Sequence, residues 1–537
     1  MKQEKIVAII LIICFSLGSC TTSDEFLNET NPNTITINEF WETEVDFQKG
    51  LMATYNTLQS DYVMGGGAVS SMHALSDIAK PNPWGQDNID LHQYNATNVN
   101  DFTINMWTEL YTGVFRANQV LENLENADIT ESSKTEIEAE ARFLRGLYYF
   151  WLATAYNDGE IIIHTSVPEN MDEFSQPLSP RNEVYALIFS DLQFAQENLP
   201  ETRSATNLGR ATWGAATSIL GKVYLYEEMF EEARIEFKKV IDSGLYHLAL
   251  DISWNFDIAH EYNPESIFEV NFSDVVKPGE TPNNATTRAA DYAPQEAGGD
   301  RNVEPAYNLI QKYKEDALDP EDPRNSGQQY SQRALASIVF KGDGQIFYQR
   351  STQEFDFGVE QEAHIKKFQN WWLTEEPVND RSGINERVVR LADVYLMYAE
   401  TVLKSSSNVS VAIQYVNMVR DRSVLLELSP DEYNAEELMH HLMYIERPLE
   451  LSFEGHMIRW QDIRRWGIVE EILAEVSQIS YRSFPNDLRE STAEDLADPN
   501  AVIVRQFVQS YENYDSAEDD FLPIPYQETI TNDEIQE

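Results

Sequence analysis

Cysteine is nearly absent from this chain of 537 residues, since Cys14 and Cys20 are its only two. Cys14 lies inside an apolar run over residues 6–17, which follows Lys2 and Lys5. A helix of about twelve residues rises roughly 18 Å, too short to cross a hydrocarbon core of about 30 Å. We therefore interpret the run as an export signal. Its removal leaves one cysteine, so the exported chain must hold its fold by packing, without disulfides.

Basic residues are also scarce. The chain has 39 Lys and Arg against 90 Asp and Glu, a formal charge of −51 and a pI near 4.4. Nucleic acids and anionic lipid headgroups bind to clustered cations, so such a surface repels both. We expect a solvated acidic surface and no nucleic-acid partner. A polyanionic ligand is disfavoured too, although a local basic patch could hold one.

The common catalytic and metal-binding motifs are missing as well. There is no P-loop, no G-x-G-x-x-G, no G-x-S-x-G and no C-x-x-C, and the nine histidines form no H-x-x-x-H ladder. We expect no cofactor. The loop "EDALDPEDPRNSG" offers Asp316, Asp319 and Asp322 as weak calcium candidates. It lacks the alternating ligand order of an EF-hand, so a structural turn is favoured.

Helical periodicity dominates what is present. Apolar residues recur at helical spacing over 38–58, 105–125, 133–156, 182–198, 210–243, 387–404, 409–422 and 435–475. Gly221, Tyr224, Ala233 and Phe237 have the small–aromatic spacing of a tetratricopeptide helix pair, and residues 399–416 repeat it with one residue of slippage. The helices are separated by long stretches rich in Gly, Asn, Asp and Pro, the second of which includes strand-like pieces such as "SIFEVNF" and "GQIFYQR".

The predicted fold class is therefore mainly α: a tetratricopeptide-like helix-pair scaffold with long irregular, partly β loop insertions. After a signal at 1–19 and a tether at 20–37, we expect a single domain over 38–537. Its scaffold covers 38–60, 105–245 and 387–475, and its insertions cover 60–105 and 250–385. Because long loops in compact proteins are usually functional, we expect the insertions to form the ligand face. The "GGG" at 65–67 reads as a flexible turn.

The densest charged stretch is residues 444–467, "YIERPLELSFEGHMIRWQDIRRWG". Helical spacing places three carboxylates on one face, with four guanidinium groups nearby: Glu446, Glu450 and Glu454, with Arg447, Arg459, Arg464 and Arg465. Carboxylates at this spacing repel one another unless arginines pair with them. An ion-pair lattice that locks helices together is the favoured interpretation. A two-carboxylate glycosidase site stays open as the alternative.

Three of the ten tryptophans lie in polar surroundings: Trp84 in "PNPWGQDN", and Trp371 and Trp372 in "FQNWWLTEEP". A planar apolar ring beside amides and carboxylates suits a sugar, whose ring has a CH-rich face edged by hydroxyls. The polar residues that flank Trp84 could bracket such a ligand; they are Asn82, Gln86, Asp87 and Asn88. The alternative for all three rings is packing at the edge of the helical bundle.

These stretches together resemble the SusD/RagB family of outer-membrane lipoproteins of Bacteroidetes, nearly end to end. The resemblance rests on a lipobox-like Leu17-Gly18-Ser19-Cys20 and then, in order, on "FLNETNPNTITINEFWETEVDFQKGLMATYNTL", "RANQVLENL", "EAEARFLRGLYYFWLATAY", "EVYALIFSDLQFAQENLP", "GRATWGAATSILGKVYLY", "VVRLADVYLMYAETVL", "IERPLELSFEGHMIRWQDIRRWG" and "FLPIP". It implies that the signal is cut before Cys20, which carries the lipid anchor. The acidic "TTSDEF" that follows resembles a surface-export signal. Pro448 departs from the family, which usually has a polar residue there.

Members of this family are not enzymes. They are glycan-binding subunits that cover a SusC-like TonB-dependent transporter. The resemblance therefore implies a non-catalytic receptor, anchored by lipid in the outer membrane and exposed at the cell surface, which hands oligosaccharide to that transporter. It also implies ligand-side roles for Asp77 and Tyr292, beside Trp84, Trp371 and Trp372. The alternatives are a receptor for peptides or another non-glycan nutrient, a glycoside hydrolase, and a pure protein-interaction scaffold.

Overall fold

The structure is a computed structural model that describes residues 40–82, 85–168, 170–275, 284–357, 362–377, 381–484 and 488–535. The expected signal at 1–19 and the tether at 20–37, with its Cys20, lie outside these residues. Within the described part of the chain, no helix combines the length and the apolar character needed to cross a membrane.

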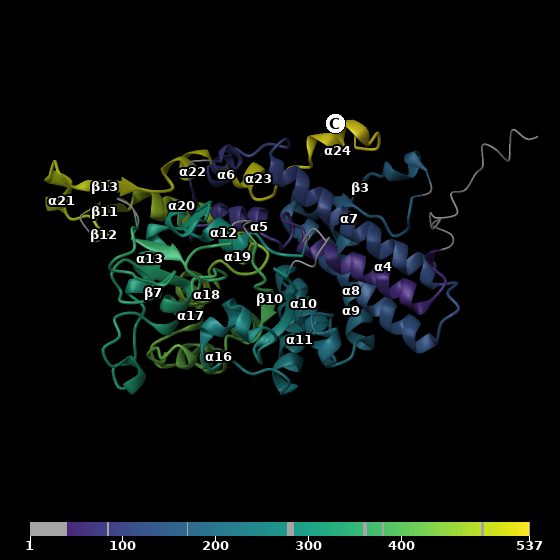
Figure 1. The fold of residues 1–537 in the computed structure, drawn as a ribbon, viewed down its shortest axis with the longest axis horizontal. Coiled ribbons are helices and arrows are strands. Elements are labelled where there is room, and N and C mark those ends of the chain that lie inside the picture. The colour runs from purple at the N-terminus through teal and green to yellow at the C-terminus, as the bar shows by residue number, and fades with distance from the viewer. Residues whose placement is uncertain are drawn as a thin grey trace, which may run out of the picture.

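Long helices lie side by side in the right half of Figure 1: α4 (Glu44–Asn56), α7 (Asp101–Leu124), α8 (Glu131–Ala155) and α9 (Arg181–Asn198). Asn100 begins α7 by accepting the backbone N–H of Phe102 at 3.0 Å, and Thr130 begins α8 by accepting that of Ser133 at 3.2 Å. Every residue of α8 from Phe143 to Ala155 is buried, because α4, α7 and α9 all pack against it.

The two tetratricopeptide-like pairs form as predicted. The first consists of α10 (Trp213–Tyr226) and α11 (Phe230–Asp242), and the second of α15 (Leu391–Ser406) and α16 (Val409–Arg422). A Cβ atom on Gly221 would lie 2.7 Å from the Phe237 ring, so a larger residue would push α10 and α11 apart. Helix α11 also packs on α15, which joins the two pairs into one scaffold. The predicted mainly α fold class is confirmed.

The helix expected over 435–475 is instead a broken run: α17 (Ala435–His441), a π-helical turn (Leu442–Glu446), α18 (Arg447–Leu451), α19 (Ile458–Arg465) and α20 (Val469–Gln478). Pro448 lies in the first turn of α18, directly after the π-helical turn. Proline has no N–H to donate to the preceding turn, so the wider turn accommodates it. Glu454 lies beyond the end of α18, and the prediction of one helical face shared with Glu446 and Glu450 is wrong.

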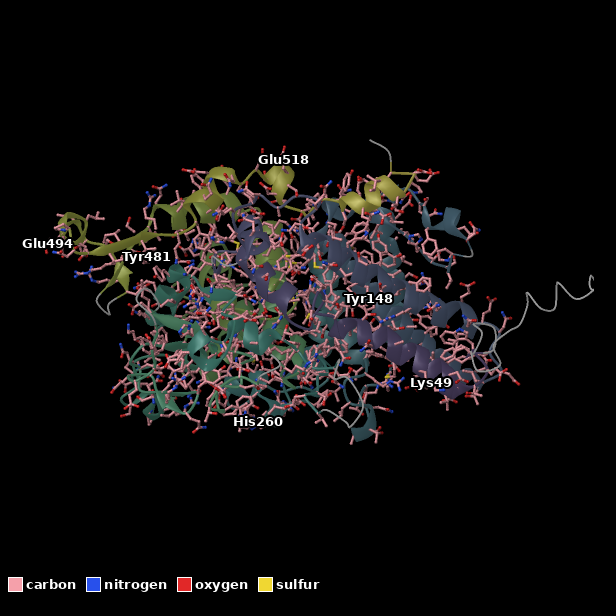
Figure 2. The ribbon with its side chains drawn as sticks, turned by 45° about the horizontal axis from the view of Figure 1, so that its top comes forward. Lys49, Tyr148, His260, Tyr481, Glu494 and Glu518 are labelled. Carbon is pink, nitrogen blue, oxygen red and sulfur yellow. The ribbon has the colours of Figure 1, made fainter. Side chains whose placement is uncertain are left out.

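The strands form small antiparallel sheets. The two-stranded pairs are β1 (Ala79–Pro81) with β5 (Val303–Pro305), β2 (Ile161–Ile162) with β3 (Leu178–Ser179), β4 (Ser266–Val270) with β10 (Glu386–Arg390), β6 (Ile338–Phe340) with β9 (Ala363–Ile365), and β7 (Ile346–Phe347) with β8 (Arg350–Ser351). Strand β11 (Ser480–Phe484) lies between β12 (Arg489–Glu490) and β13 (Val502–Arg505). This last sheet, with Tyr481 and Glu494, forms an arm at the left end of the molecule (Figure 2).

Short helices fill the rest of the described chain. They are α5 (Gly67–Met72), α6 (Gln86–His92), α12 (Arg288–Tyr292), α13 (Tyr307–Lys314), α14 (Gln332–Ser337), α21 (Ala493–Ala497), α22 (Val508–Asn513), α23 (Ser516–Asp519) and α24 (Tyr526–Thr531). The 3₁₀ turns are Thr57–Gln59, His73–Leu75, Asn157–Gly159, Met171–Phe174, Ala205–Asn207, Ile252–Phe256, Ile258–His260, Gln295–Ala297 and Pro323–Asn325. A core cluster built largely on the long helices is the most extensive, and two smaller clusters lie mainly under residues 250–385.

A buried ion-pair lattice forms on the carboxylates of residues 444–467, as the sequence predicted, but it joins loops as well as helices. Arg390 donates to Glu265 at 2.6 Å, to Glu450 at 2.7 Å and to Glu454 at 2.7 Å. Lys367, from the loop after β9, donates to Glu454 at 2.6 Å. All five side chains are at most 2% exposed, so each charge depends on these partners.

The partners within this lattice differ from those expected. Glu446 binds Arg333 and Arg420, and His441 beside them, rather than the arginines of residues 444–467. The four arginines predicted as partners bind elsewhere: Arg447 to Asp393 and Asp462, Arg459 to Asp77, Arg465 to Glu400 and Asp462, and Arg464 to the backbone carbonyls of Thr154 and Asp520. Because Arg333 belongs to α14, the lattice fixes the second insertion on the scaffold.

The three calcium candidates do not converge on one point. Asp316 accepts hydrogen bonds from Arg333 at 2.9 Å and from Ser331 at 2.6 Å, so its oxygens are occupied. Asp319 and Asp322 each accept a backbone N–H two residues later, as turn residues do. In the described residues no group of three or more His, Cys, Asp or Glu side chains could hold a metal ion. This loop is a structural turn.

Candidate ligand face

Three stretches that are distant in sequence meet in one layer, which we call the loop face: the described residues 64–82 and 85–92, then 284–306, then 338–357 and 362–377. Strands β1 and β5 join the first two, and the Thr287 N–H donates to the Gly65 carbonyl at 2.8 Å. The Glu376 N–H donates to the Ala297 carbonyl at 2.7 Å, which joins the second and third. Helices α5 and α12 lie in contact near the middle of the molecule (Figure 1). The two predicted insertions thus build one surface.

The glycines at 65–67 make this junction possible. Gly66 has a φ of +152°, and a Cβ atom there would lie 1.9 Å from the Thr287 hydroxyl. Only glycine permits this conformation and this approach. Helix α5 begins at Gly67, so the sequence-based expectation of a flexible turn is wrong: the glycines are a packed contact between two loops.

Trp371 and Trp372 lie together on the loop face, on the turn after β9. Their ring centroids are 5.9 Å apart, the planes are inclined by 79°, and both side chains are half-buried. Trp371 packs on a small apolar cluster around Phe347 and Phe355, and Trp372 packs on a second cluster. Leu373, the next residue, is 38% exposed. The pair therefore presents two ring faces at right angles beside an aliphatic side chain.

Buried hydrogen bonds fix the turn that carries these rings. The Tyr348 N–H donates to the Trp371 carbonyl at 2.8 Å, and the Tyr348 hydroxyl donates to Gln369 at 2.9 Å. Glu376 accepts the Asn370 side-chain amide at 2.7 Å and its backbone N–H at 3.1 Å. Because both sides of the turn are held, the rings are positioned before any ligand arrives.

A lysine lies against this pair. The Lys366 ammonium is 4.6 Å from the centroid of the Trp371 ring and donates to the Leu335 carbonyl at 3.0 Å. Burial lowers the pKa of Lys366 to about 8. The ammonium group thus makes a cation–π contact with one of the two rings.

The residues that the resemblance placed on the ligand side are buried. Asp77 is 1% exposed, and its carboxylate accepts hydrogen bonds from Arg459 at 2.7 and 3.1 Å. Although burial alone would raise its pKa, Arg459 holds the pKa of Asp77 below its usual value. Tyr292 is also 1% exposed and packs against Phe453. Both residues support the loop face from inside, so we correct these two assignments: neither side chain reaches the surface.

The polar residues around Trp84 differ in exposure: two are buried and two lie at the surface. Asn82 is 1% exposed, and its side-chain amide has no partner among the described residues. Asn88 is 8% exposed, and Asp87 accepts the Asn100 amide at 3.3 Å. Gln86 is exposed at the start of α6, where it donates to Asp90 at 2.7 Å. Gln86 and Asp87 therefore remain available at the surface, while Asn82 and Asn88 do not. Trp84 itself lies outside the described residues.

Sequence reasoning missed several polar groups that border the tryptophan pair. The β7–β8 hairpin carries Gln349, whose amide donates to the Trp372 carbonyl, and Arg350, which pairs with Glu296 from another stretch of the loop face. Tyr348 and Gln349 have φ of 48° and 58°, the conformation of a tight hairpin turn. The only signal in the sequence was the strand-like piece "GQIFYQR", because nothing local places this hairpin beside residue 371.

One buried carboxylate of the loop face is poorly neutralised. Asp291, on α12, accepts the Asn302 amide at 2.8 Å and lies close to Gly67. Burial is the main reason that its pKa is raised to about 7, and nearby Asp300 and Asp61 add to the effect. The carboxylate therefore changes its charge in the neutral range.

Comparison with known proteins agrees with this architecture. Residues 25–225 match a family model described as "Starch-binding associating with outer membrane", and residues 264–537 match one described as the SusD family. The SusD-like protein P25 of Formosa agariphila is 25% identical over 503 residues, which cover 88% of this chain and 92% of that protein.

Solved structures share the fold. A SusD superfamily protein from Bacteroides vulgatus has a TM-score of 0.75 at 26% identity, covering 92% of this chain and 98% of that one. A laminarin-binding SusD-like protein has a TM-score of 0.66 at 23% identity, covering 92% and 98%. The two family matches together span most of the sequence. This chain belongs to the SusD family.

Proposed function

We propose that this protein captures oligosaccharide on the loop face and delivers it to a SusC-like TonB-dependent transporter, without catalysis. The observation that carries the proposal is the perpendicular pair of half-buried rings, Trp371 and Trp372, held rigidly beside Gln349 and Lys366. Ring faces suit the CH-rich faces of sugars, and amide and ammonium donors suit their hydroxyls. The laminarin-binding relative supports a glycan as the ligand class.

The proposed location is the outer face of the outer membrane, with Cys20 as the lipid anchor. The family description, which associates these proteins with the outer membrane, supports this. Several acyl chains on one cysteine anchor a protein firmly, whereas a single chain does not. We also propose that the acidic residues after Cys20, in "TTSDEF", act as a signal for export to the cell surface.

The glycoside hydrolase alternative rested on the carboxylates of residues 444–467, and their positions do not favour it. The carboxylates of Glu446, Glu450 and Glu454 are buried and bound by arginines and by a lysine, so they do not face a substrate. A receptor for a non-glycan nutrient stays the second candidate, because aromatic rings with amides also bind peptides.

The experiment is affinity gel electrophoresis against neutral plant and algal polysaccharides, followed by calorimetry with oligosaccharides of the glycan that binds. Hydrogen bonds to sugars replace bonds to water, so each gains only about 1 kcal/mol, and we expect affinities on the order of micromolar to millimolar. Trp371→Ala and Trp372→Ala should each weaken binding about fivefold, since ring contacts contribute about 1 kcal/mol.

Trp254→Ala is the matched control. Trp254 is also half-buried, and its ring stacks on His260 with centroids 4.6 Å apart. His260 lies at the lower edge of Figure 2, on residues 250–265 rather than on the loop face. This variant should bind glycan as the wild type does. Unchanged binding by both Trp371→Ala and Trp372→Ala would refute the site, and a protein that retains no glycan would refute the function.

A further inference from the structure

A hollow lies on the scaffold, and it touches the loop face only at Asn284. It has a volume of about 530 Å³ and lies between α4, the turn at 204–210 and the end of β4. Six carboxamide side chains line it: Gln48, Asn56, Gln59, Asn207, Asn271 and Asn284. We call it the amide groove. Helix α4 lies in the right half of Figure 1, whereas strand β7, whose hairpin borders Trp371 and Trp372, lies in the left half, so the groove is distant from the tryptophan pair.

Hydrogen bonds connect the carboxamide side chains on one side of the groove. The Asn56 amide donates to the Gln59 side-chain oxygen at 2.7 Å, Gln59 donates to the Asn271 carbonyl, and the Asn271 amide donates to the Leu208 carbonyl at 3.2 Å. Each carboxamide has more donor and acceptor capacity than these bonds use. The side chains of Gln48 and Asn207 make no hydrogen bond to the described residues. The groove therefore offers preoriented donors and acceptors to a ligand.

The charges at the groove are neutralised within the protein. Arg210 donates to Glu140 at 2.6 and 2.8 Å. Glu269 lies 3.5 Å from the Arg387 guanidinium and also accepts hydrogen bonds from the Tyr262 N–H at 2.8 Å and the Asn385 amide at 3.0 Å. Both charged residues of the described lining are thus paired, which favours a neutral ligand over an ionic one.

The remaining lining is apolar. Met52 is 41% exposed and Leu208 is 40% exposed, and both border the hollow. A neutral ligand that combines many hydroxyls with CH-rich faces fits carboxamides interleaved with aliphatic side chains. The volume lies within the range of about 300–1,000 Å³ that is usual for ligand sites.

A smaller hollow of about 250 Å³ lies on the same turn and is lined by three aromatic residues, Tyr246, Tyr262 and Phe268. Both hollows are lined by Leu208, Gly209, Arg210 and Glu269. A ligand longer than one sugar unit could therefore contact both sides of this turn.

We propose that the amide groove is a second binding site for neutral oligosaccharide, independent of Trp371 and Trp372. The proposal rests on the proposed function, because it assigns the same ligand class to another surface. Two sites on one protein let a long polysaccharide bind at two points at once, which raises the affinity for polymer above that for short oligomers.

The test blocks the amide groove by chemical labelling of one introduced cysteine, which is practical because the chain has only two cysteines of its own. Asn207→Cys is introduced into the full chain with Cys14 and Cys20 both changed to serine, so a bulky maleimide reacts at one position only. Asn207 is exposed, and its only bonds in the structure are made by its backbone. The unlabelled Asn207→Cys protein is the matched control, since it differs from the labelled protein only by the blocking group.

Binding of laminari-oligosaccharides and xyloglucan oligosaccharides is measured by calorimetry in the Trp371→Ala/Trp372→Ala background. We expect the unlabelled protein to retain weak binding and the labelled protein to bind at least about tenfold more weakly. Equal binding before and after labelling overturns the proposal of a second site in the amide groove, and so does an unlabelled protein that binds no sugar. If the wild type still binds, either result leaves the proposed site on the loop face intact. A wild type that binds neither these sugars nor any polysaccharide in the electrophoresis panel overturns both proposals.

Discussion

Replacing Arg390 with methionine tests how firmly the ion-pair lattice holds the loop face on the helices. Arg390 is 1% exposed and donates to Glu265, Glu450 and Glu454 at 2.6–2.9 Å. Methionine is apolar and flexible enough to occupy the site but donates no hydrogen bond, so three buried carboxylates lose a shared cation. We expect the free energy of unfolding at pH 7 to fall by about 3–5 kcal/mol, as when one partner of a buried pair is removed.

The pKa of Glu265 gives an independent value for the stabilisation that its arginine partners provide. Burial alone would raise this pKa, but Arg422 and Arg390 hold it at about 2, against an ordinary value of 4.5. That difference corresponds to a stabilisation of roughly 3 kcal/mol at neutral pH. Arg422 also binds Glu265, so the loss of Arg390 removes only part of this amount.

The pH dependence distinguishes lost charge pairing from lost packing. A lowered pKa in the folded state contributes stability above the unfolded pKa of 4.5, and this contribution disappears as the pH falls toward 2. The difference between wild type and Arg390→Met should therefore be largest above pH 5 and should shrink steadily below pH 4.5. A packing defect would give a difference that does not depend on pH.

The assay is urea unfolding followed by tryptophan fluorescence at pH 7 and at several values below 4.5, with the midpoint as the readout. Arg234→Met is the control, because Arg234 makes an exposed pair with Glu231, three residues away, and its removal should leave the midpoint nearly unchanged. An Arg390→Met midpoint equal to that of wild type at pH 7, or a difference that does not depend on pH, would refute the reasoning.

Two further predictions concern the loop face. The raised pKa of Asp291, about 7 against 3.8, means that the folded protein binds this proton more tightly, so its stabilisation is full below pH 3.8 and is lost as the pH rises through 7. Asp291→Asn should gain stability relative to wild type by roughly 3 kcal/mol between pH 5 and pH 8, measured by denaturant midpoints, and a constant difference would contradict this. Gly66→Ala should lower the free energy of unfolding by about 1–3 kcal/mol in the same denaturant assay, because the new Cβ atom meets the Thr287 hydroxyl. Gly342→Ala is its control: Gly342 has a positive φ but no atom within 4 Å of the new Cβ, so an equal effect of both substitutions would sink the steric argument.

The helical scaffold could be predicted because its signals are local. The apolar repeat in residues 133–156 predicts a helix, and α8 occupies Glu131–Ala155. The spacing from Gly221 to Phe237 predicts a close helix pair, and the Gly221 backbone does lie against the Phe237 ring. Both patterns span no more than a few helical turns, so neighbours in sequence carry all the information.

The loop face could be predicted only in part. Trp371 and Trp372 were identified because indole rings in a polar stretch are unusual. Asp77 was misjudged, since its stretch looks like a surface loop while its partner Arg459 is 382 positions away. Nothing near residue 77 in the sequence indicates that partner.

By itself, the sequence determined the mainly α scaffold, the helix pairs, and the presence of an ion-pair lattice on the carboxylates of residues 444–467. Tertiary structure decided which arginine binds which carboxylate and which loop residues reach solvent. Arg390 is 60 positions from Glu450, and Arg333 is 113 from Glu446. A helical repeat is a pattern among residues that are close in sequence, so the sequence alone reveals it. A charged side chain can pair with any opposite charge that the fold brings near, so only the tertiary structure decides its partner.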